Sequence, residues 1–356
     1  MEDKNSEKKL SDLKDPCTID YYEPSSLTEL KDGRIIYYTS KNDLIIVMSI
    51  SLQGHEDDII IKTEIGYEGV SSIIQLQNDL VVYSEFAGLI EIITLEKNSY
   101  NSNQKIINKS DGIIRLVELN DLNFASIMRN NKIKLFQKIG EKYENTKTIE
   151  YKSDEYFLSG IESSLNNNIL VISYSKFIFV NIYNQEILKE IKANEEIKED
   201  EKFSTKEISP FTENCLRYKN IIIVAGIRQF YLIDCDKQII IKKVKIENNN
   251  YPCCSLTRFV GDTFITGSGF GEMAQYKLNE IGDDLNFICK GSLYLDRVTT
   301  CVYSKCGRLI IGEYNGLVIL SFYWLNISLL LCLNIILMIK TIIKLMVSLL
   351  IKLFKY

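Results

Sequence analysis

Side chains that often carry out catalysis are sparse in this sequence, because it contains a single histidine, His55. A Ser-His-Asp triad, a Cys-His pair or a histidine-based zinc centre would each depend on this one residue. His55 follows Gly54 in a polar stretch, so we expect a solvated histidine in a turn. The sequence therefore gives little support to histidine-dependent catalysis.

The nine cysteines do not form a recognisable metal or disulfide pattern. No two are separated by only two residues, and Cys253-Cys254 and Cys301-x4-Cys306 lack the partner spacing of a zinc site. We therefore expect reduced cysteines that behave as small apolar residues, and we predict neither a metal nor another cofactor.

Two further stretches suggest chemistry at first sight. Gly267 to Glu272 reads GSGFGE, but it lies within a predicted β-hairpin, and no helix follows to direct its amides at a phosphate. The acidic run from Asn194 to Lys202 falls in the longest step of the repeat described below, which predicts a loop inserted between repeats. Carboxylates show no recurrence at inner strand ends that would mark a calcium or hydrolase centre, so the sequence offers no candidate active site.

Composition limits the class of protein. The chain has 356 residues, 46% of them hydrophobic, which is ample for a large core. Its formal net charge is −5, without the basic excess that neutralises phosphates in nucleic-acid binders. We therefore expect a folded protein that does not bind nucleic acid.

A β-rich pattern recurs seven times along the chain, in steps of 42 to 52 residues. In each copy a tight-turn signal such as Asp32-Gly33 or Asn78-Asp79 precedes an apolar run. The first residues of these runs are Ile35, Leu80, Leu122, Ile169, Ile221, Phe264 and Leu309. Four residues later comes a small side chain, as at Thr39, Ser84, Ser126, Ser173, Ala225 and Ser268, with Gly312 beside Glu313 in the last copy. Such a layer of small residues predicts crowded packing.

Each period holds four predicted strands, which is the spacing of one propeller blade. The last copy lacks its fourth strand, whereas Cys17 to Tyr22 at the other end form a spare one. Pairing of Cys17–Tyr22 with Gly316–Phe322 would close the ring and remove two exposed sheet edges. The fold class we predict is all-β, a seven-bladed propeller of four-stranded blades. An eight-stranded barrel or a pair of sandwiches is the alternative.

Over about residues 17 to 322, and most visibly from Gly66 to Glu96, the chain resembles the WD40 family with degenerate repeats. No Trp-Asp pair ends a third strand, Gly66-Tyr67 stands where the family has Gly-His, and Asn130 and Asn315 approximate its turn aspartate. The resemblance implies a rim on which protein partners dock, built from loops that enter the first strands and loops that join the second and third. Residues of interface-forming types in these loops are Tyr67, Arg129, Tyr156, Arg228, Phe270, Tyr294 and Arg297.

We therefore expect a non-enzymatic scaffold for protein–protein interactions, with an enzyme site in the central channel as the alternative. Residues 1–16 are charged and lack the apolar stretch of a signal peptide, which predicts a disordered segment on a cytoplasmic protein.

Residues 323–356 form a hydrophobic and basic tail. An uncharged run from Leu317 to Ile339 could cross a bilayer as a helix, placing the propeller on the cytosolic face of a membrane. The residues of the tail expected to contact the membrane are Trp324, Lys340, Lys344, Lys352 and Lys355. Because Asn326 and Asn334 oppose insertion, two alternatives stay open: a tail that lies on the membrane surface, and translated non-coding sequence.

Overall fold

The computed structural model describes most of the chain between Cys17 and Ser321. The described residues are 17–19, 24–39, 44–51, 54–62, 69–108, 112–120, 122–163, 168–193, 215–226, 229–246, 253–259, 261–269, 271–279, 284–292, 298–313 and 316–321. Secondary structure in this part consists of β-strands alone. The predicted helical tail, residues 323–356, and the predicted disordered segment, residues 1–16, lie outside it.

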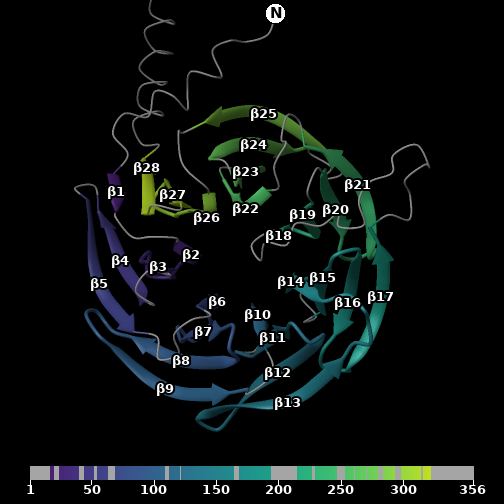
Figure 1. The fold of residues 1–356 in the computed structure, drawn as a ribbon, viewed down its shortest axis with the longest axis horizontal. Coiled ribbons are helices and arrows are strands. Elements are labelled where there is room, and N and C mark those ends of the chain that lie inside the picture. Colours follow the sequence, from purple (N-terminus) through teal and green to yellow (C-terminus); the bar gives the residue numbers. More distant parts are fainter. Residues whose placement is uncertain are drawn as a thin grey trace, which may run out of the picture.

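The strands form seven separate four-stranded antiparallel sheets arranged in a ring (Figure 1). Blade 1 comprises β2 (Pro24–Glu29), β3 (Ile35–Thr39), β4 (Leu44–Ser51) and β5 (Gly54–Lys62); blade 2 comprises β6 (Val70–Gln75), β7 (Val81–Glu85), β8 (Leu89–Leu95) and β9 (Tyr100–Ile107). Blade 3 comprises β10 (Ile113–Glu118), β11 (Phe124–Met128), β12 (Lys132–Ile139) and β13 (Lys142–Glu150); blade 4 comprises β14 (Phe157–Glu162), β15 (Asn168–Ser173), β16 (Lys176–Asn181) and β17 (Glu186–Lys192). Blade 5 comprises β18 (Cys215–Tyr218), β19 (Ile221–Ala225), β20 (Gln229–Asp234) and β21 (Ile239–Lys245); blade 6 comprises β22 (Cys253–Arg258), β23 (Thr263–Ser268), β24 (Glu272–Leu278) and β25 (Leu285–Ser292). Blade 7 comprises β26 (Val298–Tyr303), β27 (Arg308–Glu313), β28 (Gly316–Ser321) and, from the N-terminal side, β1 (Cys17–Ile19).

The ring closes as predicted, through the outermost strand of blade 7. β1 pairs antiparallel with β28, with Cys17 opposite Ile319 and Ile19 opposite Leu317. Because β1 occupies the outer position that the chain after β28 would otherwise fill, the first and last repeats share one sheet. The seven-bladed propeller is therefore confirmed, and the barrel or sandwich alternative is wrong.

The turns between first and second strands have the geometry that the turn signals predicted. Gly33, Asp79, Lys219, Gly261 and Gly307 all have positive φ angles there. One boundary is wrong: Leu122, predicted to begin the second strand of blade 3, lies in the turn with φ 64°, and β11 begins at Phe124. The Asn120-Asp121 signal therefore marks a turn that is two residues longer than expected.

The layer of small residues in the second strands is also confirmed. Thr39, Ser84, Ser126 and Ala225 are fully buried, and Ser173 and Ser268 are nearly so. Neighbouring blades also approach closely at a first strand, at Gly160 of β14, where an added Cβ would lie 2.1 Å from Cδ1 of Ile127 in blade 3. Small side chains thus permit the tight radial packing of the ring.

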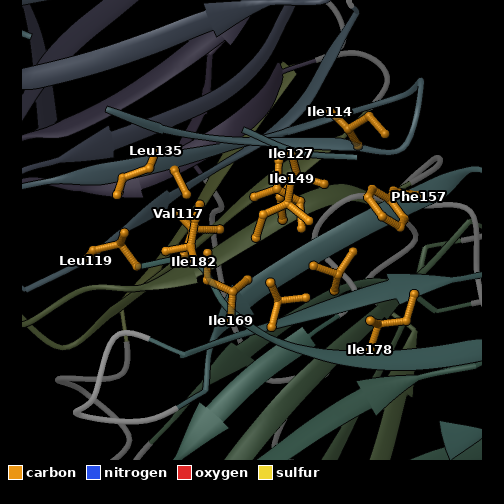
Figure 2. Close-up of a cluster of buried hydrophobic side chains, with 14 residues drawn as sticks. Ile114, Val117, Leu119, Ile127, Leu135, Ile149, Phe157, Ile169, Ile178 and Ile182 are labelled. Carbon is orange, nitrogen blue, oxygen red and sulfur yellow. The ribbon is translucent and has the colours of Figure 1, made fainter. Parts of the chain in front are cut away.

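Apolar side chains fill the space between every pair of neighbouring blades in the described part of the chain. Between blades 3 and 4, Ile127 and Ile149 face Phe157 and Ile178 (Figure 2). Full burial of one such side chain stabilises the fold by about 1.5–3 kcal/mol. The core of this protein therefore lies between its blades, and each blade depends on both of its neighbours.

His55 differs from its prediction, because it lies in β5 and pairs with Ile50 of β4, whereas a polar turn was expected. The pairing of β4 with β5 extends to Ser51 and Gly54. The polar start of β5 therefore belongs to the ladder of blade 1.

Candidate partner-binding rim

One face of the ring collects the two kinds of loop named in the sequence prediction. Because successive strands of a blade are antiparallel, loops that enter a first strand and loops that join the second and third strands come to the same end of each sheet. Arg129 and Tyr156 are the two predicted rim residues within the described part of the chain. The other five, Tyr67, Arg228, Phe270, Tyr294 and Arg297, lie outside it, in segments that connect β5 to β6, β19 to β20, β23 to β24 and β25 to β26.

Arg129 follows β11 in the turn to β12, and its side chain is exposed. Its backbone amide donates to the carbonyl oxygen of Gly112, at 2.8 Å. A Cβ on Gly112 would lie 3.9 Å from Cβ of Arg129 and 3.1 Å from the carbonyl oxygen of Phe86. The backbone that presents Arg129 is therefore closely supported by the loop entering blade 3.

Tyr156 belongs to residues 151–156, the loop that enters blade 4, and 59% of its surface is exposed. Exposure alternates along this loop: Lys152, Asp154 and Tyr156 face solvent, whereas Ser153 and Glu155 are half-buried against the propeller. Such alternation is that of an extended segment held along one side.

The side chain of Asn131 holds that loop to blade 3. Its Nδ2 donates to the carbonyl oxygens of Ser153, at 3.2 Å, and Glu155, at 2.8 Å, and its Oδ1 accepts from the amide of Phe157, at 3.1 Å. Asn131 is only 7% exposed and has a φ of 61°, a conformation that asparagine tolerates better than most residues. Tyr156 therefore stands between two backbone positions fixed by one amide.

Glu155 fastens the same loop to blade 4. Its carboxylate accepts hydrogen bonds from the hydroxyl of Ser173, at 2.9 Å, from the amide of Ser175, at 3.1 Å, and from the hydroxyl of Ser175. Burial alone raises the pKa of Glu155, but these hydrogen bonds and the nearby Lys176 outweigh it and bring the pKa below its ordinary value. An ionised Glu155 is thus part of the folded loop at neutral pH.

We call this arrangement the Asn131–Glu155 clamp: residues 151–156, fixed on one side by Asn131 and on the other by Glu155. It brings Arg129 and Tyr156 onto the same sector of the rim. Neither clamp residue was predicted from the sequence, where Asn130 was the residue likened to the turn aspartate; Asn130 is exposed. The sequence does offer one signal, which is the position of Asn131 directly before β12. Asparagine tolerates a positive φ, and its side-chain amide can hydrogen-bond to nearby backbone in such turns.

Carboxylates recur on the opposite face, at inner strand ends where the sequence predicted no pattern that would mark a calcium or hydrolase centre. Glu29, Glu118 and Glu162 each end an innermost strand, at positions paired with the start of the second strand, and Gln75 holds the same place in blade 2. Glu29 accepts from the amide of Lys305 in blade 7, at 2.8 Å. Burial raises the pKa of Glu118, and Glu162 raises it further against the influence of Lys31.

These carboxylates do not form a metal centre. Within the described residues, no three His, Cys, Asp or Glu side chains are grouped so that they could hold a metal ion. Glu162 instead accepts from Nδ2 of Asn120, at 3.4 Å, and pairs with Arg217, at 3.3 Å. The position thus serves contacts between neighbouring blades in at least three places.

The glycine-rich stretch GSGFGE lies at a hairpin, as predicted, between β23 and β24. Gly271 has a φ of 72° in the turn, and a Cβ on Gly267 would lie 2.5 Å from Cγ1 of Val298 in blade 7. Turn geometry and tight packing account for these two glycines without a phosphate.

The acidic run of residues 194–202 and the tail residues Trp324, Lys340, Lys344, Lys352 and Lys355 lie outside the described part of the chain. The run does fall between β17 of blade 4 and β18 of blade 5, the inter-blade position predicted for it. Among the residues that the structure describes, none belongs to a helix of the length and apolarity needed to cross a bilayer.

No protein-family model and no curated protein matches this sequence. Similar folds occur among solved structures. A chain of the mitotic checkpoint complex crystal structure aligns with a TM-score of 0.66 at 12% identity, covering 86% of this chain and 89% of that one. The structure of the RRP9 WD40 repeats aligns with a TM-score of 0.65 at 11% identity, covering 86% and 96%.

A streptogramin B lyase structure is equally similar, with a TM-score of 0.66 at 10% identity over 86% of this chain and 96% of that one. At such low identities the likeness concerns the fold alone. It agrees with the predicted WD40-like propeller, and it shows that one propeller architecture accommodates both WD40 repeat proteins and an enzyme.

Proposed function

We propose that this WD40-like seven-bladed propeller is a non-enzymatic scaffold that binds protein partners on the rim bearing Arg129 and Tyr156. The observation that carries the proposal is the Asn131–Glu155 clamp. Tyrosine and arginine are the residue types that dominate binding energy at protein interfaces. Here they are exposed on backbone that hydrogen bonds already hold in place.

Preorganisation matters because a flexible loop loses conformational entropy when a partner orders it. At least six hydrogen bonds made by Asn131 and Glu155 fix residues 151–156 before any partner arrives. The interaction energy of Tyr156 is therefore available for binding, with little spent on ordering its loop.

The test compares partner capture by rim variants. Two alanine variants are compared with the unaltered protein: one with Arg228, Phe270 and Arg297 all replaced, and one with Arg129 and Tyr156 both replaced. Each should lose specific partners identified by cross-linking and mass spectrometry. Circular dichroism and thermal unfolding should stay unchanged. Lys142→Ala is the matched control, because Lys142 is exposed on the opposite face of blade 3. Capture that is equal for all variants would contradict the proposal.

An enzyme remains the second candidate, favoured by the half-buried Glu118 close to Glu162 at one mouth of the ring. A pair of interacting carboxylates with raised pKa values is a common acid–base arrangement. A tightly bound metal or cofactor in the purified protein, seen by elemental analysis or absorbance, would favour an enzyme of any kind over the scaffold.

Membrane attachment through residues 323–356, and with it a place on the cytosolic face of a membrane, stays a prediction from the sequence. The scaffold function does not depend on it, because the rim and the tail are separate parts of the chain. Fractionation of the full-length protein and of a version ending at Phe322 would test the attachment.

A further inference from the structure

Four exposed side chains lie on or beside the Asn131–Glu155 clamp: Arg129, Lys152, Asp154 and Tyr156. None makes a side-chain hydrogen bond or an ion pair to any residue in the described part of the chain. Nearby charges are already matched, with Lys132 3.2 Å from Glu150 and Lys176 3.8 Å from Glu190. The four side chains are therefore available to a partner.

Arg129 differs from the other arginines that the structure describes. Arg34 pairs with Asp32, Arg217 pairs with Glu162, and Arg258 lies over the ring of Tyr218, at 5.0 Å. Arg308 is buried and Arg115 is half-buried. A guanidinium presents five N–H donors in a planar fork that fits an oxyanion, so the exposed Arg129 calls for an acceptor from outside.

The surroundings of Arg129 suit a carboxylate acceptor better than a phosphate. Asp154 and the ionised Glu155 lie in the neighbouring loop, and only Arg129 and Lys152 are unpaired cations among the described residues of this sector. A phosphate carries nearly two negative charges at neutral pH, so two nearby carboxylates repel it more strongly than they repel one carboxylate.

We propose, on the basis of the scaffold function above, that this sector of the rim binds a peptide segment with an aspartate or glutamate close to a large apolar residue. The carboxylate pairs with the guanidinium of Arg129, and the apolar side chain packs on the ring of Tyr156. The clamp sets the spacing between these two contacts, which gives the sector its specificity.

A phage-displayed library of random ten-residue peptides tests this chemistry on the full-length protein. The unaltered protein should enrich peptides with Asp or Glu within two or three residues of Leu, Phe or Tyr. The charge-reversing variant Arg129→Glu should enrich Lys or Arg in that place. Lys142→Glu, on the opposite face of the same blade, should select the same acidic peptides as the unaltered protein.

Binding of one enriched peptide, measured by fluorescence anisotropy, should weaken about tenfold or more with Arg129→Ala and with Tyr156→Ala. Exchange of its acidic residue for glutamine should have a similar effect, and exchange for phosphoserine should not improve binding. Thermal unfolding of each variant checks that the fold is intact.

Enrichment of peptides without an acidic residue, or of the same acidic peptides by Arg129→Glu, would overturn this inference while leaving a peptide-binding scaffold in place. Tighter binding of the phosphoserine peptide would overturn the choice of a carboxylate. Enrichment of no peptide at all would also count against the inference, and partner capture by the rim variants would then decide the scaffold function independently.

Discussion

Gly267→Ala offers the sharpest test of how neighbouring blades pack. The new Cβ would lie 2.5 Å from Cγ1 of Val298, 3.1 Å from its Cβ and 3.6 Å from its Cγ2. Rotation of the valine cannot relieve contacts with all three atoms, so β26 must move away from β23. Overpacking of this kind costs about 1–3 kcal/mol. We expect a loss of that size in the free energy of unfolding.

A double-mutant cycle with Val298→Ala separates this clash from a general effect of alanine in β23. Val298→Ala removes two buried methyl groups, which costs about 2 kcal/mol including the cavity. In the double variant the largest clash disappears, so its destabilisation should be smaller than the sum of the two single changes by about 1 kcal/mol or more. Urea unfolding followed by far-ultraviolet circular dichroism measures the free energy of unfolding of all four proteins. A Gly267→Ala protein as stable as the parent, or strictly additive changes, would refute the packing explanation.

Four further outcomes follow from the structure and the sequence. Deletion of residues 1–22 should lower the melting temperature of the whole propeller, because blade 7 loses β1; an unchanged melting temperature would show that the closure is wrong. Glu118→Gln should stabilise the protein at pH 7 in thermal unfolding, since burial raises the pKa of the native carboxyl and its charged form is disfavoured. The sign follows from linkage: a raised native pKa adds stability only while the group is protonated, so the advantage of glutamine should vanish below the ordinary carboxyl pKa, and a gain that persists there would refute it. Asn131→Ala should destabilise the protein by about 1–3 kcal/mol, because it leaves the amide of Phe157 and the carbonyl oxygens of Ser153 and Glu155 unpaired, and increased hydrogen exchange confined to residues 151–157 would report it. A tagged full-length protein should fractionate with membranes and one ending at Phe322 with the cytosol; equal soluble behaviour of both would reject the predicted membrane attachment.

The repeat could be predicted because its signals are local. Alternating β-rich runs, turn residues such as Asp32-Gly33, and small residues such as Ser84 recur within a few positions of each other. A positive φ at a glycine or asparagine depends on neighbouring residues only, so turn placement was right in most blades. Leu122 shows the limit, because an apolar residue within a turn looks in the sequence like the first residue of the strand that follows.

The partner-binding sector could be predicted only in part. Arg129 and Tyr156 were found because residue type and loop position point to exposure. Asn131 and Glu155 were missed because their partners, Phe157 for one and Ser173 for the other, belong to the next blade. A sequence pattern states which residues alternate within a strand, but it does not state which neighbouring loop each side chain meets.

By itself the sequence determined the number of blades, their strands and the strand exchange that closes the ring, because each depends on short-range periodicity and turn chemistry. Only the tertiary structure decided which side chains meet between blades. Five first strands besides β2 carry a bulge in their pairing with the second strand, as at Leu158 in β14, and a bulge inserts one residue and so reverses the alternation of faces. That shift places Ser159 against blade 5 and Gly160 against blade 3, and it sets which face each later residue of β14 occupies. The packing that accompanies the bulge involves side chains of two neighbouring blades, so the sequence of a single repeat does not predict it.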